Sequence, residues 1–237
     1  MAENHFDFKQ FRINQEKAAF RVGTDSVLLG AWTDLRGVST VLDVGTGTGV
    51  LALMVAQRST ARIVAIEPDS LSAGEAEANI AMSRWKDRIT IIETSLQEYL
   101  YKTAERYDLI ISNPPYFSGS LANPDPRSAG ARHALTLSGE ELISASGSLL
   151  TEKGRLSIVL PYAEGNLFIA TASGYGLYCN RMTRVKPLPG SPVKRLLMEF
   201  GRTKEELVSD YLIIGKGERH NYTEEYTRLT RDFYLEF

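Results

Sequence analysis

Three glycines stand within the segment Asp43-Val-Gly-Thr-Gly-Thr-Gly49, between an apolar run and a helical stretch. Glycine lets a backbone turn tightly and approach a ligand closely. The helix that follows such a turn presents free N–H groups to that ligand. Tight turns between a strand and a helix also use glycine for packing alone. The segment therefore predicts a strand–turn–helix unit whose turn either binds a ligand or serves packing.

Short apolar runs alternate with helical stretches as far as Pro161. Continuous apolar runs suit strands that are buried on both faces of a parallel sheet, and the alternation favours helices on both sides. The expected strands are Thr40–Gly45, Arg62–Glu67, Ile89–Glu93, Tyr107–Ser112 and Gly154–Leu160. The expected helices are Val50–Gln57, Asp69–Ser83, Leu96–Lys102 and Leu137–Leu150.

The pattern changes after Pro161, where turn formers join two β-rich runs and predict an antiparallel hairpin. The remaining expected elements are a helix at Ala163–Ala172, hairpin strands at Gly176–Lys186 and Lys194–Arg202, a strand at Tyr211–Ile214 and a helix at Thr223–Tyr234. Residues 117–131 are expected to form a long loop. The sequence predicts an α/β fold: a doubly wound, Rossmann-like, mostly parallel sheet of about seven strands with a terminal antiparallel hairpin.

Composition excludes several classes of protein. Of 237 residues, 43% are hydrophobic and 24% are charged, as in globular domains, and the net charge of −2 excludes a uniformly basic surface. The single cysteine excludes an internal disulfide, and the three histidines lack metal-ligand spacing. Because no apolar run spans a membrane and no signal peptide is recognisable, we expect a cytoplasmic monomer with neither a metal nor a membrane partner.

An acidic residue, Glu67, ends the second expected strand. A carboxylate at the tip of that strand accepts both ribose hydroxyls of a bound nucleoside. The turn GTGTG also differs from the dinucleotide spacing G-x-G-x-x-G. The turn resembles motif I of the class I S-adenosylmethionine-dependent methyltransferases, where it faces the methionine part of the cofactor.

That resemblance implies S-adenosylmethionine as the cofactor. In this family an acidic residue orders the turn, another holds the ribose, and an Asp often lies beside the adenine; here Ser95 takes the place of that Asp. A hydroxyl is a weaker acceptor for the adenine amine. The cofactor-binding residues implied in this part of the chain are Asp43, Gly45, Gly47, Gly49, Glu67, Pro68, Ser95 and Leu96.

The segment Asn113-Pro-Pro-Tyr116 follows the fourth expected strand. Ligands of doubly wound sheets bind at the carboxyl ends of the strands, so this segment is expected beside the reactive methyl group. The Asn113 side-chain oxygen and the Pro114 carbonyl can accept the two N–H bonds of a planar amino group and stabilise the charge that develops on its nitrogen. Tyr116 offers a face for stacking a base. The bland alternative is an ordinary turn after a strand.

The tetrapeptide resembles the amino-methyltransferases that act on adenine N6, cytosine N4, guanine N2 or glutamine N5. The resemblance implies that Asn113, Pro114, Pro115 and Tyr116 are catalytic. Guanine-N2 members usually carry Phe in place of the tyrosine. The glutamine-N5 enzymes usually have an additional N-terminal domain, and only 39 residues precede the first expected strand here. Glutamine-N5 methylation of a protein and a non-catalytic module that binds nucleosides or RNA remain the alternatives.

The stretch from Phe20 to Trp32 reads FRVGTDSVLLGAW. Thr24 or Asp25 is expected to cap a helix there. The whole phrase resembles the family of bacterial tRNA1(Val) adenine-37-N6 methyltransferases, in which it covers the cofactor; Thr24 and Asp25 are therefore implied in cofactor binding. The resemblance implies that residues 1–35 form a covering segment, residues 36–237 the methyltransferase part of one structural domain, and adenine 37 in the anticodon loop of tRNA the substrate.

Positive charge gathers near the expected hairpin. Between Gly176 and Glu205, seven Lys or Arg residues stand against two Glu, a net charge of +5. Such a patch can contact RNA phosphates, although most charge runs are simply solvated. The candidate RNA-binding residues are Arg132, His133, Lys186, Lys194 and Arg195.

Overall fold

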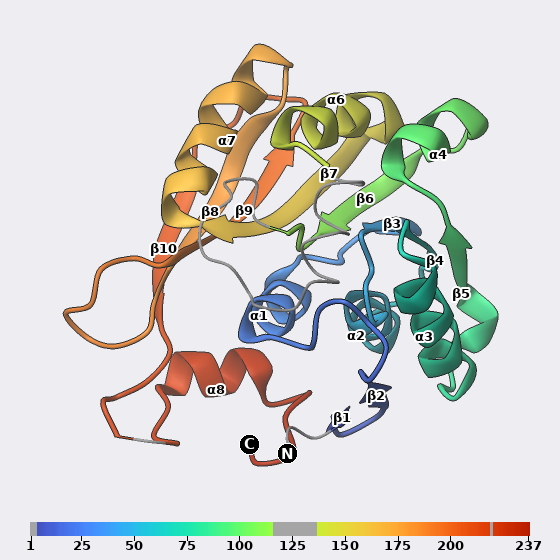
Figure 1. Ribbon diagram of the computed structural model, residues 1–237. Helices are drawn as coiled ribbons and strands as arrows, with labels where there is room; N and C mark the ends of the chain where they lie inside the picture. The colour runs from blue at the N-terminus through green and yellow to red at the C-terminus, as the bar shows by residue number, and fades with distance from the viewer. Residues whose placement is uncertain (1–3, 116–136, 219) are drawn as a thin grey trace.

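The computed structural model describes residues 4–115, 137–218 and 220–237. Its centre is an eight-stranded sheet with the order β10-β8-β9-β7-β6-β3-β4-β5 (Figure 1). The strands of this sheet are β3 Thr40–Val44, β4 Arg62–Glu67, β5 Ile89–Glu93, β6 Tyr107–Ser112, β7 Leu150–Pro161, β8 Tyr178–Lys186, β9 Arg195–Gly201 and β10 Val208–Ile213. The predicted α/β fold with a mostly parallel sheet is therefore confirmed.

The parallel half of the sheet follows the sequence pattern closely. Strands β4, β5 and β6 have the predicted bounds, and β5, β4, β3, β6 and β7 pair in parallel. Strand β7 begins earlier than expected, at Leu150. Strand β9 is antiparallel to both β7 and β8, which confirms the hairpin. The carboxyl ends of the parallel strands thus share one edge with the β8–β9 connection.

Two parts of the sheet structure differ from the prediction. The predicted final strand forms β10, and its parallel pairing with β8 at the outer edge, which gives a sheet of eight strands, was not predicted. The segment before residue 15 forms a separate two-stranded sheet, β1 His5–Asp7 and β2 Arg12–Asn14, which was not expected. Strands of three residues are too short for alternation to register. They are held by distant contacts, such as the hydrogen bond from Lys9 N to the Phe233 carbonyl.

Helices cover both faces of the sheet (Figure 1). Those on one face are α1 Thr24–Trp32, α2 Val50–Arg58, α3 Ser70–Ala81 and α8 Glu224–Thr230, and those on the other are α4 Leu96–Lys102, α6 Gly139–Leu149 and α7 Tyr162–Gly174. A 3-10 turn, η1, spans Lys86–Arg88. Each face has its own apolar core, and within the described residues no helix is long and apolar enough to cross a membrane.

Capping side chains at the N-termini of the helices account for several of these bounds. Asp69 accepts a hydrogen bond from the Ser72 N–H at the start of α3, and Ser138 and Glu141 form a capping box at α6. Such caps satisfy N–H groups that a helix leaves without a partner. The predicted cap of α1 is wrong: the N-cap is Gly23, with no side-chain cap. The Asp25 carboxylate instead accepts a hydrogen bond from Arg195.

Candidate functional site

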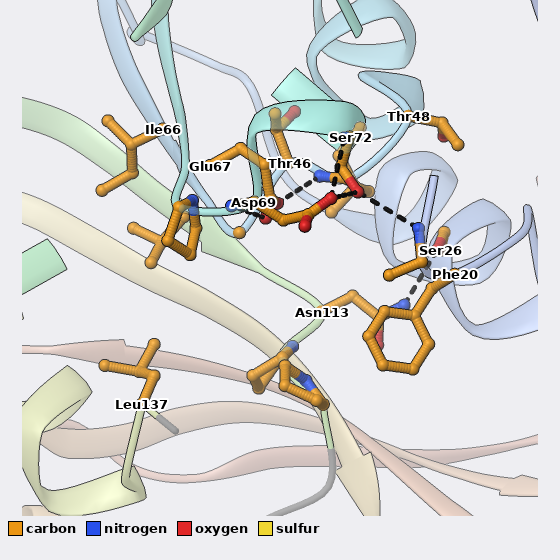
Figure 2. Close-up of a pocket in the computed structure, with 18 of the residues that line it drawn as sticks. Phe20, Ser26, Thr46, Thr48, Ile66, Glu67, Asp69, Ser72, Asn113 and Leu137 are labelled. Carbon is orange, nitrogen blue, oxygen red and sulfur yellow. Dashed lines mark hydrogen bonds between the residues drawn. The ribbon is translucent and has the colours of Figure 1, made fainter. Parts of the chain in front are cut away.

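A cavity of about 620 Å³ lies at the carboxyl ends of the parallel strands. Pockets of 300–1,000 Å³ hold nucleoside-sized ligands. Its walls come from the N-terminal segment, the glycine turn and the ends of β4, β5 and β6, which together surround one space (Figure 2). Most of the candidate residues line it: Thr24, Asp25, Gly45, Gly47, Glu67, Pro68, Ser95, Leu96, Asn113, Pro114, Pro115 and Arg195.

The glycine turn has a backbone that only glycine adopts readily. Gly45, Gly47 and Gly49 have φ values of 71°, 56° and 84°, all in the left-handed region. The N–H groups of Gly45 and Thr46 donate to the Ile66 carbonyl at 3.0 and 3.1 Å, which fixes the turn against the end of β4. Gly45 and Gly47 face the cavity, whereas Gly49 lies behind them as the N-cap of α2.

Asp43 supports this turn from behind and is not part of the cavity wall. Its side chain is fully buried, and its Oδ2 accepts a 2.6 Å hydrogen bond from the Thr46 hydroxyl. Burial raises the pKa of Asp43 to about 7. The predicted ordering role agrees with this geometry, but any effect of Asp43 on a ligand acts through the turn.

Glu67 joins the turn to the end of β4. Its Oε2 accepts a 2.9 Å hydrogen bond from the Gly47 N–H, and its Oε1 accepts one of 3.1 Å from the Asp69 N–H. Burial raises the pKa of this carboxyl, while the two backbone donors oppose the shift. Figure 2 shows Glu67 beside Thr46 and Asp69 in the cavity wall. Glu67 thus orders the turn and also lines the cavity.

Helix α3 holds the N-terminal segment against the cavity. The Glu75 carboxylate accepts hydrogen bonds from three successive backbone N–H groups, at residues 16, 17 and 18, within 2.9 Å. The Asn79 amide bonds to both the N–H and the carbonyl of Asn14. Both side chains are buried, at 6% and 1% exposure. The sequence analysis did not select these two residues. The pattern that could have indicated them is a carboxylate and an amide on the buried face of a helix.

Phe20 lies on the rim of the cavity as a consequence of this attachment. Its side chain is 44% exposed, and Figure 2 shows its ring on the same side of the cavity as Asn113. All of residues 19–26 except Val22 line the cavity. An exposed aromatic ring at the mouth of a cavity offers a flat apolar contact for a ligand.

Asn113 follows β6 and is held from two directions. The neighbouring Ser112 donates a 2.8 Å hydrogen bond to the Val44 carbonyl, which fixes the end of β6 against β3. The Asn113 Nδ2 donates to the Ser26 Oγ on α1, also at 2.8 Å (Figure 2). Ser26 lay inside the phrase that sequence reasoning selected, but its contact with Asn113 was not expected.

Ser95 has a structural role that the resemblance to the family did not suggest. Its hydroxyl accepts a hydrogen bond from the Glu98 N–H and caps α4 at the edge of the cavity. Tyr116, Arg132 and His133, together with the expected loop at 117–131, lie outside the described residues.

The basic residues counted near the hairpin do not form one patch. Arg181 packs over the Trp32 ring at 3.7 Å and pairs with Glu199, and Arg202 donates to the carbonyls of residues 147 and 150. Arg195 lines the cavity, where its Nε donates to the Asp25 carboxylate at 2.7 Å.

Only part of this charge lies near the cavity. Lys186 ends β8 and Lys194 precedes β9, so both lie at the edge of the sheet that carries the cavity. Arg202 and Lys204 follow β9 at the opposite edge. The net charge of the segment therefore does not describe one surface, because spacing along the chain does not reveal which ends of the strands coincide.

Comparison with solved structures identifies the fold. A crystal structure of a protein from Agrobacterium tumefaciens, described as a predicted O-methyltransferase, superposes with a TM-score of 0.69. It is 22% identical, and the match covers 88% of this chain and 96% of that one. A likeness at this identity concerns the fold alone.

Comparison with sequences identifies the family. The model of the methyltransferase small domain matches residues 21–166. A protein of Bacteroides thetaiotaomicron named tRNA1(Val) (adenine(37)-N6)-methyltransferase is 44% identical over 99% of both chains. A protein of Trichodesmium erythraeum with the same name is 42% identical over the full length of both. The chain belongs to the methyltransferase small-domain family, in the group that contains these relatives.

Proposed function

We propose that this protein transfers a methyl group from S-adenosylmethionine to N6 of adenine 37 in the anticodon loop of tRNA1(Val). Relatives of that name match it at 40–44% identity over nearly their whole length. The observation that carries the proposal is the position of the Asn113 amide, which lies in the wall of the same cavity as the glycine turn and Glu67.

The cavity fits the cofactor by its chemistry. Gly45 and Gly47 bring backbone close to the space without side chains, as the methionine part requires. Glu67 supplies a buried carboxylate for the ribose hydroxyls. Ser95 and Leu96 border the region expected for the adenine. Residues 1–35 act in this proposal as a cover, with Thr24 and Asp25 on its inner side.

When bound, the cofactor supplies an electrophilic methyl group for a single in-line displacement by the adenine nitrogen. The Asn113 Oδ1 and the Pro114 carbonyl accept the two N–H bonds of the amino group and draw its nitrogen toward a tetrahedral shape. Fixed acceptors stabilise the positive charge that develops there without reorganising. The methylated nitrogen then loses its extra proton to water. In this proposal Tyr116 stacks on the base. The base leaves the stack of an unpaired loop, which costs less free energy than leaving a duplex.

The test of the activity is incubation with methyl-labelled cofactor and RNA from a strain that lacks the enzyme. We expect label in tRNA1(Val), recovered as N6-methyladenosine after nuclease digestion and mass spectrometry. A matched transcript with guanine at position 37 should accept none.

The same incubation with lysate protein distinguishes the alternatives. Label in protein, released as N5-methylglutamine, would replace the proposal with the protein-directed reaction. Binding of the cofactor without transfer to either fraction would identify a non-catalytic module.

The proposal assigns contacts with tRNA phosphates to five basic residues: Arg132, His133, Lys186, Lys194 and Arg195. Of these, Lys186 and Lys194 lie at the edge of the sheet that carries the cavity. Reversing both lysines to glutamate should weaken tRNA binding and flatten its salt dependence. Each lost phosphate contact lowers the log–log slope by about 0.7–0.9. Filter binding at several salt concentrations measures the slope, and calorimetry should show unchanged cofactor affinity.

The matched control is the double reversal Lys153→Glu with Lys204→Glu. Both of these lysines are exposed, and they lie near the start of β7 and after β9, at the edge of the sheet away from the cavity. This control variant changes the net charge by the same amount, so its binding to tRNA should weaken only through the loss of long-range electrostatic attraction. Equal slopes in the two double variants would show that Lys186 and Lys194 make no phosphate contact.

A further inference from the structure

We infer that Ser26 is a positioning residue, which holds the Asn113 side chain in the wall of the cavity so that its amide oxygen can meet the substrate amino group. This inference rests on the proposed function and deepens it. The carboxamide of asparagine has a donor nitrogen on one side and an acceptor oxygen on the other. A bond at the nitrogen end restrains the side chain and leaves its oxygen end turned away from Ser26.

The contact ties the nitrogen end of the Asn113 amide to helix α1. The Asn113 Nδ2 donates to the Ser26 Oγ at 2.8 Å, a normal distance for such a bond. None of the described residues donates a hydrogen bond to the Asn113 Oδ1, and the proposed reaction assigns that oxygen to the substrate. Ser26 is only 8% exposed, and it lines the cavity together with Asn113.

Both partners are fixed by neighbours that belong to different elements. On the side of Asn113, the Ser112 hydroxyl ties the end of β6 to the Val44 carbonyl. On the side of Ser26, the first turn of α1 is held by the ion pair of Asp25 with Arg195, at 2.7 Å. That pair has half-buried side chains, at 20% and 28% exposure. A bond between two fixed groups restrains a rotamer more than a bond to a mobile partner does.

Ser26→Ala should lower the turnover number about tenfold, the effect of one orienting hydrogen bond. The KM for tRNA and the affinity for S-adenosylhomocysteine should not change, because Ser26 acts through Asn113. Ser26→Thr keeps a hydroxyl at the same atom and should restore most of the rate.

The decisive comparison uses Asn113→Ala as background, measured by single-turnover transfer of labelled methyl. Alanine has no amide for Ser26 to hold. Ser26→Ala should therefore cost clearly less there than with Asn113 in place. A purely structural role for Ser26 would give the same loss in both backgrounds.

Three results would overturn the inference: a wild-type rate for Ser26→Ala, a Ser26→Thr variant as slow as Ser26→Ala, or equal losses in the two backgrounds. Failure of the wild-type protein to methylate adenine N6 at all would instead contradict the proposed function. The two failures are thus distinguishable within one set of measurements.

Discussion

Replacing Asn113 with alanine should slow single-turnover methyl transfer by about 10²–10³-fold, the usual cost of losing one preorganised acceptor of this kind. Binding of S-adenosylhomocysteine should remain near the wild-type level, because the acceptor bond strengthens only as the nitrogen becomes tetrahedral. Rapid-quench transfer to saturating tRNA measures the rate, and calorimetry measures the affinity.

Asn166→Ala is the matched control for this substitution. Asn166 is an exposed asparagine on α7, where its amide donates to the Tyr162 carbonyl, and it does not line the cavity. It should transfer methyl at the wild-type rate. A full single-turnover rate for Asn113→Ala would remove the acceptor role and, with it, the main argument for attack by an amino group.

Replacing Glu67 with alanine should weaken cofactor binding by about 1–3 kcal/mol, or roughly 5- to 150-fold in dissociation constant. The substitution leaves ribose hydroxyls without an acceptor in a closed site and also removes the acceptor of the Gly47 N–H. Calorimetry with S-adenosylhomocysteine measures the loss. Glu93→Ala is the control. Glu93 lies on β5 as the register partner of Glu67, but it is exposed and does not line the cavity.

The two roles of Glu67 can be separated with the 2′,3′-dideoxy analogue of S-adenosylhomocysteine. If the carboxylate holds the ribose, the analogue should bind wild-type protein more weakly, and Glu67→Ala should add little further loss. If Glu67 only orders the turn, the substitution should weaken both ligands by the same factor.

The parts of the fold that were predictable are those whose cause lies within a few residues. The exact bounds of β4, which follow from one continuous apolar run, were predicted, and so were the bounds of α4. The left-handed glycines at 45, 47 and 49 explain why the turn was recognisable. The sequence likewise identified Glu67 and Asn113, because a residue at the end of a strand in a parallel sheet lies at the ligand edge whatever its partners are.

The errors concern interactions between distant parts of the chain. Thr24 or Asp25 was expected to cap α1, but the Asp25 carboxylate meets Arg195, 170 positions away. The position of Arg195 in the cavity wall was not predicted either. The sequence did not predict the outer pairing of β10 with β8 or the attachment of the N-terminal segment to α3.

The sequence by itself thus determined the sheet, the glycine turn and which residues stand at its ligand edge. Periodicity, backbone propensity and capping act locally, so they can be read from neighbouring residues. Only the tertiary structure decided which polar groups bond to each other, because a hydrogen bond depends on atoms that folding brings together. The contact of Ser26 with Asn113 spans 87 positions, and no local pattern encodes the 2.8 Å that joins them.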